Sequence, residues 1–305
     1  MQAAGKEYDV AFVTVNYNTC DLTKQLLQFL RTAALPFSYK LVVVDNNSKD
    51  GSHEFLSAQD DIVYIQAGEN LGYGKAINRG ILASQSRYIC VLNTDVILNS
   101  AALIALWEHL EKSADVGVVS PLVTNQDGSI QGFIFYKTTM AIIFNILNKI
   151  RTSLIKRKLA GSTTPQQVDG VLGAFFLIRR SVATSGKLFD EDFFFYFEDT
   201  DLAHRLCDAG IKCHVLPGYS IIHLGGSSTS LQAARIFFKS KSIYLKKHYG
   251  DSFAGLIARL DKLRLAIKLI KYRFLSAFIK SPKIISKRDY YASMQQALEF
   301  SKKRS

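Results

Sequence analysis

Short apolar runs that each end in a polar residue constrain the fold of this chain more than any other feature. The runs at residues 10–15, 40–44 and 88–92 are directly followed by Asn16, Asp45 and Asn93. Segments with apolar side chains at helical spacing occupy residues 22–30, 52–57, 76–83 and 101–110. Strands that alternate with helices in this way predict an α/β fold with a mostly parallel, doubly wound sheet. In such sheets, ligands bind beyond the carboxyl ends of the strands, where these polar residues lie.

Basic residues are concentrated in two parts of the chain. Of the net charge of +12, residues 246–305 contribute +11, with 15 Lys and Arg against 4 Asp and Glu, and residues 133–159 hold six basic residues and no acidic one. We therefore expect a catalytic domain at residues 1–235, with a basic and apolar insert at 133–165 near the acceptor site, and an amphipathic helical region at 236–305. The two basic stretches predict a polyanionic neighbour, either an anionic lipid surface or nucleic acid.

Residues 253–280 carry apolar side chains at steps of three and four, interleaved with Lys and Arg. This pattern is typical of a helix that lies in a lipid interface, although such a stripe could instead pack on the catalytic domain. The tail has no recognised nucleic-acid motif, so we favour an anionic membrane surface as the partner and no nucleic acid. No run of about 18 apolar residues predicts a membrane-spanning helix, and the four cysteines form no CxxC pair. We expect a cytoplasmic protein bound peripherally to the inner face of the cell membrane.

The segment after the second run, residues 45–52, can hold a nucleoside. Asp45 can accept a hydrogen bond from a base N–H or a ribose hydroxyl, and Asn47 lies in the polar turn that follows. Ser48 and Ser52 can cap the next helix. The alternative is an ordinary strand–turn–helix connection with an Asx-turn, and the segment by itself does not separate the two.

A glycine-containing turn at residues 70–80 can receive a diphosphate. Its glycines let backbone amides approach closely at a helix start, and Lys75 and Arg79 supply positive charge. Ile77 occupies the last position of what would be a GxGxxG fingerprint, which argues against a nicotinamide or flavin site. A simple capped turn would also account for the glycines.

Asn93 and Asp95 follow the third run and can bind a metal. Alternation along a strand directs these two side chains the same way, and a hard divalent cation that bridges a diphosphate prefers such oxygen ligands. Asn99 can cap the next helix, so Asp95 is not needed for that purpose. His223, at the end of a later apolar run, could present an imidazole to a metal, although a lone histidine is more often structural.

Five aromatic residues at 193–197 lead directly into an acidic helix start. Glu198 and Asp199 could merely complement the helix dipole, which should keep a carboxylate ionised, and Asp201 and Arg205 are spaced for a structural ion pair. Aromatic side chains beside two carboxylates are also what a sugar hydroxyl needs, because they offer a stacking surface and a general base.

Taken in this order, the five segments resemble glycosyltransferase family 2, which has the GT-A fold, and within it the rhamnosyltransferase-like branch that builds cell-envelope polysaccharides. The resemblance extends over residues 10–228. It implies an inverting, metal-dependent glycosyltransferase that adds a single sugar, because the QxxRW motif of the processive synthases is absent. The implied donor is dTDP-rhamnose or a UDP-sugar, and the implied acceptor is lipid-linked or a polysaccharide.

The resemblance also implies roles for single residues. Asp199, with Glu198, would provide the catalytic base. Asp95 would be the main carboxylate ligand of Mg²⁺ or Mn²⁺, because Asn93 stands where the family's DxD motif has its first acid, and His223 would be a further metal ligand. The donor-binding residues expected from the segments and the resemblance together are Asn16, Asp45, Asn47, Asn70, Gly72, Asn78, Asn93, Thr94 and Gly173.

Two other functions fit parts of the pattern. A sugar-1-phosphate nucleotidyltransferase also uses an α/β nucleotide fold, but it usually has a Gly-rich loop with Arg or Lys after the first strand, where residues 16–18 of this chain are Asn-Tyr-Asn. A non-catalytic nucleotide-sugar-binding protein would not need the combination of Asp95, Asp199 and His223. Sugar-nucleotide hydrolysis that requires added metal would separate the first function from both.

Overall fold

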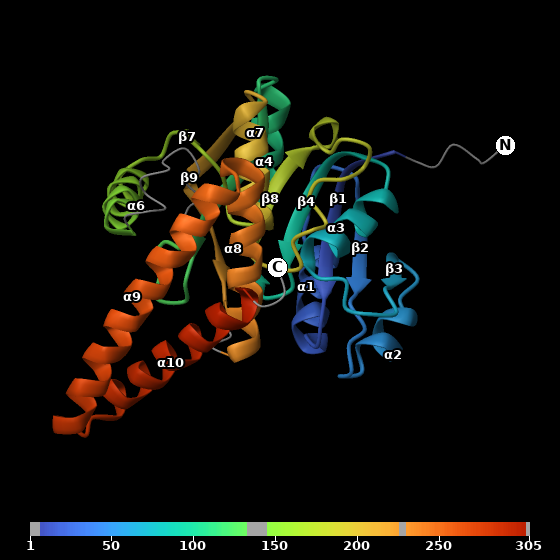
Figure 1. Ribbon diagram of the computed structural model, residues 1–305. Helices are drawn as coiled ribbons and strands as arrows, with labels where there is room; N and C mark the ends of the chain where they lie inside the picture. Colours follow the sequence, from blue (N-terminus) through green and yellow to red (C-terminus); the bar gives the residue numbers. More distant parts are fainter. Residues whose placement is uncertain (1–6, 133–144, 226–229, 303–305) are drawn as a thin grey trace. The chain divides into compact units, whose positions relative to one another are not determined.

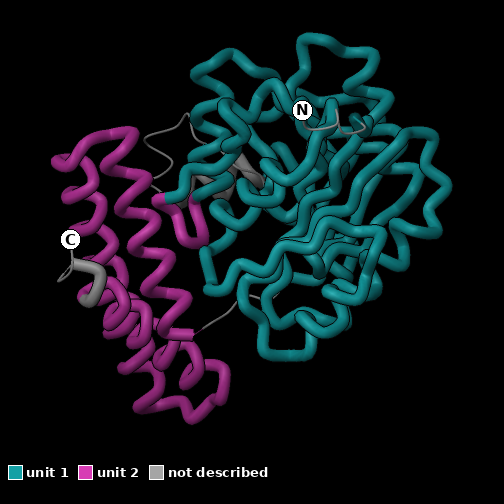
Figure 2. Tube along the Cα trace, turned by 90° about the vertical axis from the view of Figure 1, so that its right-hand side faces the viewer, with its two compact units in different colours: residues 1–191, 198–225 teal, residues 192–197, 226–305 magenta. Residues whose placement is uncertain are grey.

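The computed structural model describes residues 7–132, 145–225 and 230–302 (Figure 1). The chain divides into two compact units, shown in different colours in Figure 2. Unit 1 comprises residues 1–191 and 198–225, and unit 2 comprises residues 192–197 and 226–305. The aromatic segment 192–197 thus belongs to unit 2, whereas the sequence placed it in the catalytic domain. The first part of the expected insert, residues 133–144, lies outside the described residues.

Unit 1 is built on one mixed sheet. Its strands are β1 Tyr8–Asn16, β2 Tyr39–Asp45, β3 Ile62–Gln66, β4 Ser86–Asn93, β5 Val96–Ile97, β6 Val116–Thr124, β7 Gln166–Val168, β8 Phe175–Arg179 and β9 Lys212–His223. The order in the sheet is β3-β2-β1-β4-β8-β6-β9-β5, and β7 pairs with β9. Strands β1 to β4 are parallel, as are β6 and β9, while β8 lies antiparallel between β4 and β6. The predicted α/β fold with its parallel sheet is confirmed, and the antiparallel position of β8 was not foreseen.

Helices cover both faces of this sheet (Figure 1). The helices of unit 1 are α1 Cys20–Thr32, α2 Ser52–Ser57, α3 Tyr73–Leu82, α4 Ser100–Lys112, α6 Asn145–Ala160 and α7 Glu198–Asp208, with a short 3-10 helix at Arg180–Val182. Alternate residues of β1 enter two separate cores. Val10 and Phe12 pack in the core of α1, α2 and α4, whereas Ala11 and Val13 pack in the core of α3 and α7. Because the central strands are buried on both faces, their sequences are nearly continuous apolar runs.

Several element boundaries differ from the sequence prediction. Strand β8 begins only at Phe175, although the apolar run starts at Val171, because Gly173 and Ala174 form a turn. Strand β6 was not predicted, and of β9 only the end at His223 was expected. Asn99 does cap α4, since its side chain accepts a hydrogen bond from the Ala101 N–H at 2.9 Å.

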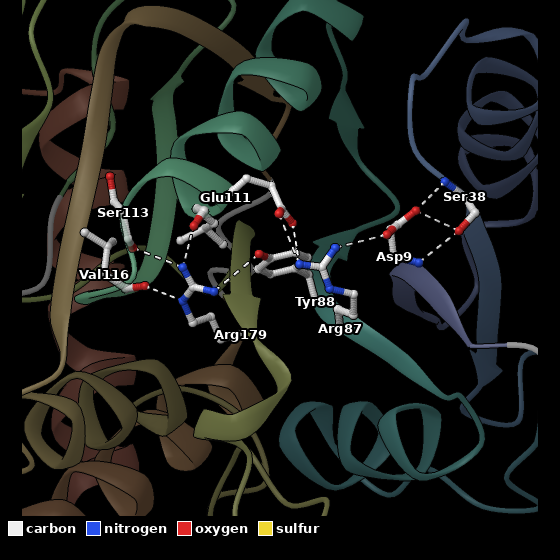
Figure 3. Close-up of polar contacts among 9 residues, drawn as sticks. Asp9, Ser38, Arg87, Tyr88, Glu111, Ser113, Val116 and Arg179 are labelled. Atoms are coloured by element: carbon white, nitrogen blue, oxygen red, sulfur yellow. Dashed lines mark hydrogen bonds and ion pairs between the residues drawn. The ribbon is translucent and has the colours of Figure 1, made fainter.

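Two arginines fasten the amino-terminal ends of the strands, at the edge opposite to their carboxyl ends (Figure 3). Arg87 lies between two acids, 3.3 Å from Asp9 and 2.9 Å from Glu111. Arg179, at the end of β8, donates to the carbonyl oxygen of Val116 at 2.8 Å. None of the predicted site residues takes part in these contacts. The amino-terminal edge of the sheet is therefore held together independently of the carboxyl edge, where the predicted site lies.

Unit 2, in its described part, consists of the segment 192–197 and three helices (Figure 2). The helices are α8 Leu231–Tyr249, α9 Asp251–Phe278 and α10 Pro282–Lys302. Their small core contains Ala234, Phe238, Ala297 and Leu298. Lys241 of α8 forms an ion pair with Asp261 of α9 at 2.6 Å. Pro282 begins α10, and Gly250 separates α8 from α9 with a φ of 84°.

Candidate active site

Asn16 and Asp45 are the last residues of β1 and β2 and lie opposite each other in the parallel register. The Asn16 amide nitrogen donates to Asp45 Oδ1 at 2.7 Å and to Ser48 Oγ at 2.9 Å. Its amide oxygen accepts from the hydroxyls of Thr19 at 2.9 Å and Thr23 at 2.7 Å. The buried Asn16 amide uses all its donors and acceptors within the protein and orients Asp45, so its predicted role in donor binding, which stays a prediction, would act through Asp45.

Asp45 is held by the turn that follows it. Its carboxylate accepts from the Ser48 hydroxyl at 2.5 Å and from the Ser48 N–H at 3.2 Å. Gly51, with a φ of 82°, occupies the N-cap position of α2, and the hydroxyl of Ser52 donates to Asp50 at 2.5 Å. The predicted capping by Ser48 and Ser52 is therefore wrong, because two aspartates engage both hydroxyls.

Asn46 and Asn47 connect the end of β2 to the next turn. Asn47 has a φ of 65°, which asparagine tolerates, and its amide oxygen accepts from Lys49 at 2.9 Å. Asn46 is buried and donates to the carbonyl oxygen of Gly72 at 3.0 Å. The buried amide oxygen of Asn46 has no partner among the described residues. Such an acceptor, next to Asp45, is a group that a ligand N–H or a water could satisfy.

Asn70 and Gly72 form the turn that precedes α3. The Asn70 amide oxygen accepts from the Gly72 N–H at 3.0 Å, and Gly72 has a φ of 80°, which favours glycine. Because Gly72 also accepts from Asn46, the turn is fixed on both sides. Lys75 follows in the first turn of α3, where an anion would meet the helix amino terminus.

Asn78, predicted to contact the donor, has a structural role. Its amide oxygen accepts from the N–H groups of Leu188 at 2.9 Å and Phe189 at 3.0 Å. Its amide nitrogen donates to the Phe189 carbonyl oxygen at 2.8 Å and to Glu191 at 3.1 Å. All four hydrogen-bonding positions are used, so Asn78 fastens this loop to α3 and has no capacity left for a donor.

Asn93, Asp95 and His223 lie together, because β5 follows Asp95 and pairs with β9. Asp95 Oδ1 lies 3.3 Å from His223 Nε2, and Asn93 Nδ2 lies 3.3 Å from the same nitrogen. Burial opposes ionisation of Asp95, but the hydrogen bond and charge of His223 outweigh it and lower the pKa of that carboxyl below its usual value. Thr94, between the two, is buried, and its hydroxyl donates to that of Thr19 at 3.0 Å.

The Asp95–His223 pair suits a divalent cation. His223 Nδ1 lies 2.8 Å from Gln131 Oε1, while Gln131 Nε2 donates to the His223 carbonyl oxygen at 2.9 Å. With the Gln131 oxygen as acceptor, Nδ1 carries a proton, and Nε2 faces Asp95, where it could bind a cation after losing the proton that it shares with that carboxylate. Among the residues that the structure describes, no cluster of three or more His, Cys, Asp or Glu could hold a metal. Mg²⁺ or Mn²⁺ bound here would therefore complete its shell with phosphate oxygens and water.

A backbone hydrogen bond joins this pair to a second acidic cluster. The Asn93 N–H donates to the carbonyl oxygen of Ala174 at 2.9 Å, next to the start of β8. One residue earlier, the Gly173 N–H donates to Asp199 Oδ2 at 3.2 Å. The segment of Asp95 and the carboxylate of Asp199 therefore flank the same two-residue turn.

Glu198 and Asp199 begin α7, as predicted. The partly buried Asp199 carboxylate also accepts from the Thr200 hydroxyl at 3.3 Å. Glu198 is buried, and its Oε2 has no hydrogen-bond partner among the described residues. Two adjacent carboxyl groups with so few donors disfavour a full charge on both.

Burial controls the protonation of this carboxyl pair. It raises the pKa of Glu198 to about 8, with the charge of Asp199 as the second cause. It also raises the pKa of Asp199, against the opposing hydrogen bonds from Gly173 and Thr200. Burial thus opposes the stabilisation that the helix dipole would give to ionised Asp199. The two groups titrate as a pair.

Asp201 and Arg205 form the predicted ion pair of α7, with 2.8 Å between Arg205 Nε and Asp201 Oδ2. Asp201 is fully buried, and Arg205 also donates to the carbonyl oxygen of Leu188 at 2.7 Å. Asp201 is thus committed to holding the helix in place.

The aromatic residues before Glu198 pack within unit 2. The ring of Phe197 lies 5.4 Å from that of Phe237 on α8. Phe194 and Phe195 are 39% and 42% exposed, so aromatic surface is available to a ligand. Stacking of a sugar on this surface stays a prediction.

Sequence reasoning missed Gln131 and Tyr73. Gln131 follows β6 in a polar stretch without a motif, and nothing indicates that it contacts His223. Tyr73 lies inside the expected donor segment, but its hydroxyl donates to the backbone oxygen of Gly173, 100 positions away. A backbone partner at that distance leaves no signal in the sequence.

A doubly wound sheet with an Asp–His pair and a carboxyl pair at its carboxyl edge defines a glycosyltransferase of the GT-A fold. The sequence profile of glycosyl transferase family 2 matches residues 11–185, and the chain belongs to this family. The family predicted from the five segments is confirmed.

Two relatives are rhamnosyltransferases. The N-acetylglucosaminyl-diphospho-decaprenol L-rhamnosyltransferase of Mycobacterium tuberculosis is 27% identical over 226 residues, which are 67% of this chain and 73% of the relative. Rhamnosyltransferase WbbL of Escherichia coli K12 is 26% identical over 251 residues, which are 78% of this chain and 93% of WbbL. The predicted similarity to the rhamnosyltransferase-like branch is confirmed.

Two solved structures share the fold. The mannosyltransferase PcManGT from Pyrobaculum calidifontis, in complex with GDP-Man and Mn²⁺, gives a TM-score of 0.59 at 14% identity and covers 98% of this chain and 87% of its own. GalNAc-T7 with UDP, GalNAc and Mn²⁺ gives 0.55 at 14% identity, with 96% and 56% covered. At this identity the likeness shows the fold alone.

Proposed function

We propose that this chain is an inverting, divalent-cation-dependent enzyme that transfers a single rhamnose from dTDP-rhamnose to a hydroxyl of a lipid-linked acceptor in cell-envelope glycan synthesis. The observation that carries the proposal is the 2.9 Å hydrogen bond from the Asn93 N–H to Ala174. It joins the segment of Asp95 to the turn that binds Asp199. Ligands for a cation on a diphosphate and a base for an acceptor would thus lie at one edge of one sheet.

The donor would extend along this edge from Asp45 to Asp95. Asp45 and Asn47 would contact the nucleoside, and Lys75 would add positive charge near the diphosphate. A divalent cation held by Asp95 and His223 would supply the charge that stabilises the departing diphosphate. The two neighbours of the same fold solved with Mn²⁺ support this part of the proposal.

Asp199 would be the base. Its carboxylate takes the proton of the acceptor hydroxyl while the hydroxyl oxygen bonds to the anomeric carbon. The bond from that carbon to the diphosphate oxygen breaks, and the diphosphate leaves with the electron pair. Attack opposite the leaving group inverts the configuration. Because burial raises the pKa of both Glu198 and Asp199, the proton they hold sets the pH above which the base is available.

The relatives support the choice of sugar and acceptor. Both named relatives are rhamnosyltransferases, and the mycobacterial name specifies an N-acetylglucosaminyl-diphospho-decaprenol acceptor. An acceptor of that chemistry has a lipid tail, a diphosphate and a sugar hydroxyl. UDP-sugars such as a UDP-hexose or UDP-galactofuranose are the alternative donors.

Helix α9 supports a peripheral position on the cytoplasmic face of the membrane. No described helix is long and apolar enough to cross a bilayer. Six residues of the apolar stripe predicted on this helix are exposed, namely Leu256, Leu260, Leu263, Ile267, Ile270 and Phe274, and Phe278 extends this exposed side. Ala254, Ile257 and Leu269 are the buried residues of α9. The other described helices of unit 2 thus leave this side of α9 exposed, which supports a lipid surface as its partner.

Basic residues flank the exposed stripe of α9. Those on the surface include Arg259, Lys262, Arg264, Lys271 and Arg273. Near an anionic leaflet each contributes about 1 kcal/mol to adsorption. Exposed apolar surface with a basic border matches an anionic lipid interface and would bring the enzyme to an acceptor held there.

The proposal is tested by incubating the full chain with Mn²⁺, dTDP-rhamnose and a polyprenyl-diphosphate-linked N-acetylglucosamine acceptor. Transfer of one rhamnose, abolished by a chelator, is the expected result. Parallel reactions with UDP-glucose and UDP-galactofuranose test the alternative donors. Release of pyrophosphate from dTTP and a sugar-1-phosphate would instead indicate a nucleotidyltransferase. Nucleotide-sugar binding without turnover would indicate a binding protein.

A further inference from the structure

The hydroxyl of Tyr73 contacts the turn that holds Asp199. Tyr73 is the first residue of α3, directly after the Asn70–Gly72 turn, and its hydroxyl donates to the carbonyl oxygen of Gly173 at 2.7 Å. The hydrogen bond is buried. Helix α3, which begins where the diphosphate is expected, is therefore hydrogen-bonded to Gly173, the residue whose N–H contacts Asp199.

Gly173 fits closely against Asp199. Its N–H donates to Asp199 Oδ2 at 3.2 Å. A Cβ atom on Gly173 would lie 3.3 Å from the Asp199 Cβ and 3.5 Å from Oδ2, so any side chain here would press on the carboxylate. Movement of the Gly173 backbone would therefore change both the position of Asp199 and the hydrogen bond that favours its ionised form.

The ring of Tyr73 is held in place as well as its hydroxyl. Its centroid lies 5.8 Å from that of Phe189. The backbone of Phe189 is in turn held by the side-chain amide of Asn78, further along α3, which donates to its carbonyl oxygen and accepts from its N–H. A Cβ on Gly74 would lie 2.8 Å from the Phe189 Cβ, which shows how closely α3 approaches this loop. These contacts fix the ring of Tyr73 and thereby keep its hydroxyl against the carbonyl oxygen of Gly173.

We propose that Tyr73 is a positioning residue that couples the donor-binding turn to the catalytic base through the backbone of Gly173. Three hydrogen bonds make up the connection. Asn46, beside Asp45, donates to Gly72 at 3.0 Å, Tyr73 donates to Gly173 at 2.7 Å, and Gly173 donates to the base at 3.2 Å. The inference rests on the proposed role of Asp199 as base and adds that Tyr73, at the end of the donor-binding turn, holds this base in position.

The raised pKa of Tyr73 is consistent with a hydroxyl that always donates its hydrogen bond to Gly173. Burial, followed by the charges of Glu198, Asp199 and Asp95, raises the pKa of Tyr73 well above its usual value. The hydroxyl therefore keeps its proton throughout the pH range in which the carboxyl pair titrates. The titratable groups that interact with it are these three acids and the buried thiol of Cys90.

The test compares Tyr73→Phe with Tyr39→Phe. Tyr39 is a matched control, because its hydroxyl also donates to a backbone oxygen, that of Leu30, at 2.7 Å, but in the core on the other face of the sheet. Tyr73→Phe should lower kcat roughly 10- to 100-fold with nearly unchanged nucleotide affinity. The acidic limb of its kcat–pH profile should move to higher pH, because Gly173, no longer held by the Tyr73 hydroxyl, would donate less well to Asp199 and so stabilise its ionised form less. Tyr39→Phe should leave kcat and the limb unchanged.

Gly173→Ala provides a second variant that leaves the tyrosine intact. Its Cβ should displace Asp199 and move the acidic limb in the same direction. If both variants keep the wild-type limb, or if Tyr39→Phe shifts it equally, the coupling is refuted and Tyr73 contributes only to stability. This outcome is distinct from failure of the proposed function, which would appear as absent transfer by the wild-type enzyme.

Discussion

The carboxylate of Asp95, in the turn before β5, lies 3.3 Å from the imidazole Nε2 of His223, at the end of β9, although the two residues are far apart in the sequence. The antiparallel pairing of β5 with β9 brings them together. Gln131 fixes the imidazole by accepting from Nδ1 at 2.8 Å. An oriented imidazole beside an ionised carboxylate is prepared for a cation before any nucleotide arrives.

Substitution of either Asp95 or His223 should abolish the effect of metal on nucleotide affinity. Calorimetric titration of dTDP should show affinity that increases with Mn²⁺ for the wild type, whereas Asp95→Ala and His223→Ala should lose that increase, roughly 10- to 100-fold. His214→Ala, on the same strand but paired with His109 at 3.0 Å, serves as the control and should keep it. Equal binding by the wild type with Mn²⁺ and with chelator would disprove the metal site.

Glu198→Gln should stabilise the protein increasingly as the pH rises. Burial raises the pKa of Glu198 from 4.5 to about 8, so the wild type loses stability as the pH climbs between these values, whereas glutamine has no charge to acquire. Urea unfolding at pH 5 and at pH 8.5 should show a relative gain of roughly 1–4 kcal/mol at the higher pH. Glu54→Gln, an exposed position on α2, is the control. A pH-independent difference between wild type and variant would contradict the assigned burial effect.

Substitution on the exposed stripe should release the enzyme from membranes. Ile267 and Ile270 are 57% and 67% exposed, so the double change to Asn should leave the fold intact. In flotation with anionic vesicles at low salt, the bound fraction should fall about tenfold, because two apolar side chains no longer enter the interface. Leu82→Asn, 62% exposed on α3, should float like the wild type. If the double variant floats like the wild type, α9 is not the lipid contact. The same conclusion follows if the wild type is a dimer and the two substitutions separate its chains without changing flotation.

Asn78→Ala should destabilise unit 1 more than loss of a helix cap does. The substitution leaves buried groups of Leu188 and Phe189 without their partner, which should cost about 2–4 kcal/mol. Asn99→Ala removes the N-cap of α4 and should cost about 1 kcal/mol. Chemical unfolding of both variants measures the difference. If Asn78→Ala keeps wild-type stability but binds the nucleotide-sugar more weakly, Asn78 contacts the donor, as the sequence predicted, and its structural role is refuted.

The parallel half of the sheet could be predicted because apolar runs and helical spacing alternate there without interruption. The position of β8 could not, because an apolar run such as Phe175–Ile178 carries no information on strand direction or neighbours. For the same reason the sequence identified Asp95 and His223 as candidates but not Gln131, whose role depends on where β6 ends.

The protonation of Asp199 shows a further limit. Its place at a helix start predicts a stabilised charge, but the burial that opposes this charge is created by the fold around it. Similarly, Asn16 and Asn78 have the residue type of donor ligands, yet both amides are fully used inside the protein. Residue type and order were sufficient for the family, whereas only the hydrogen bonds show which side chains are already fully engaged within the protein.

The most direct test of the central claim is the rate of sugar transfer by Asp199→Asn under saturating donor, Mn²⁺ and acceptor. If Asp199 is the base, transfer should fall by roughly 10² or more, while nucleotide affinity measured by calorimetry stays near that of the wild type. The change preserves the shape of the side chain and its contact with Gly173, so misfolding is not expected to lower the rate. Near wild-type turnover by Asp199→Asn would contradict the assignment of the base and the mechanism built on it.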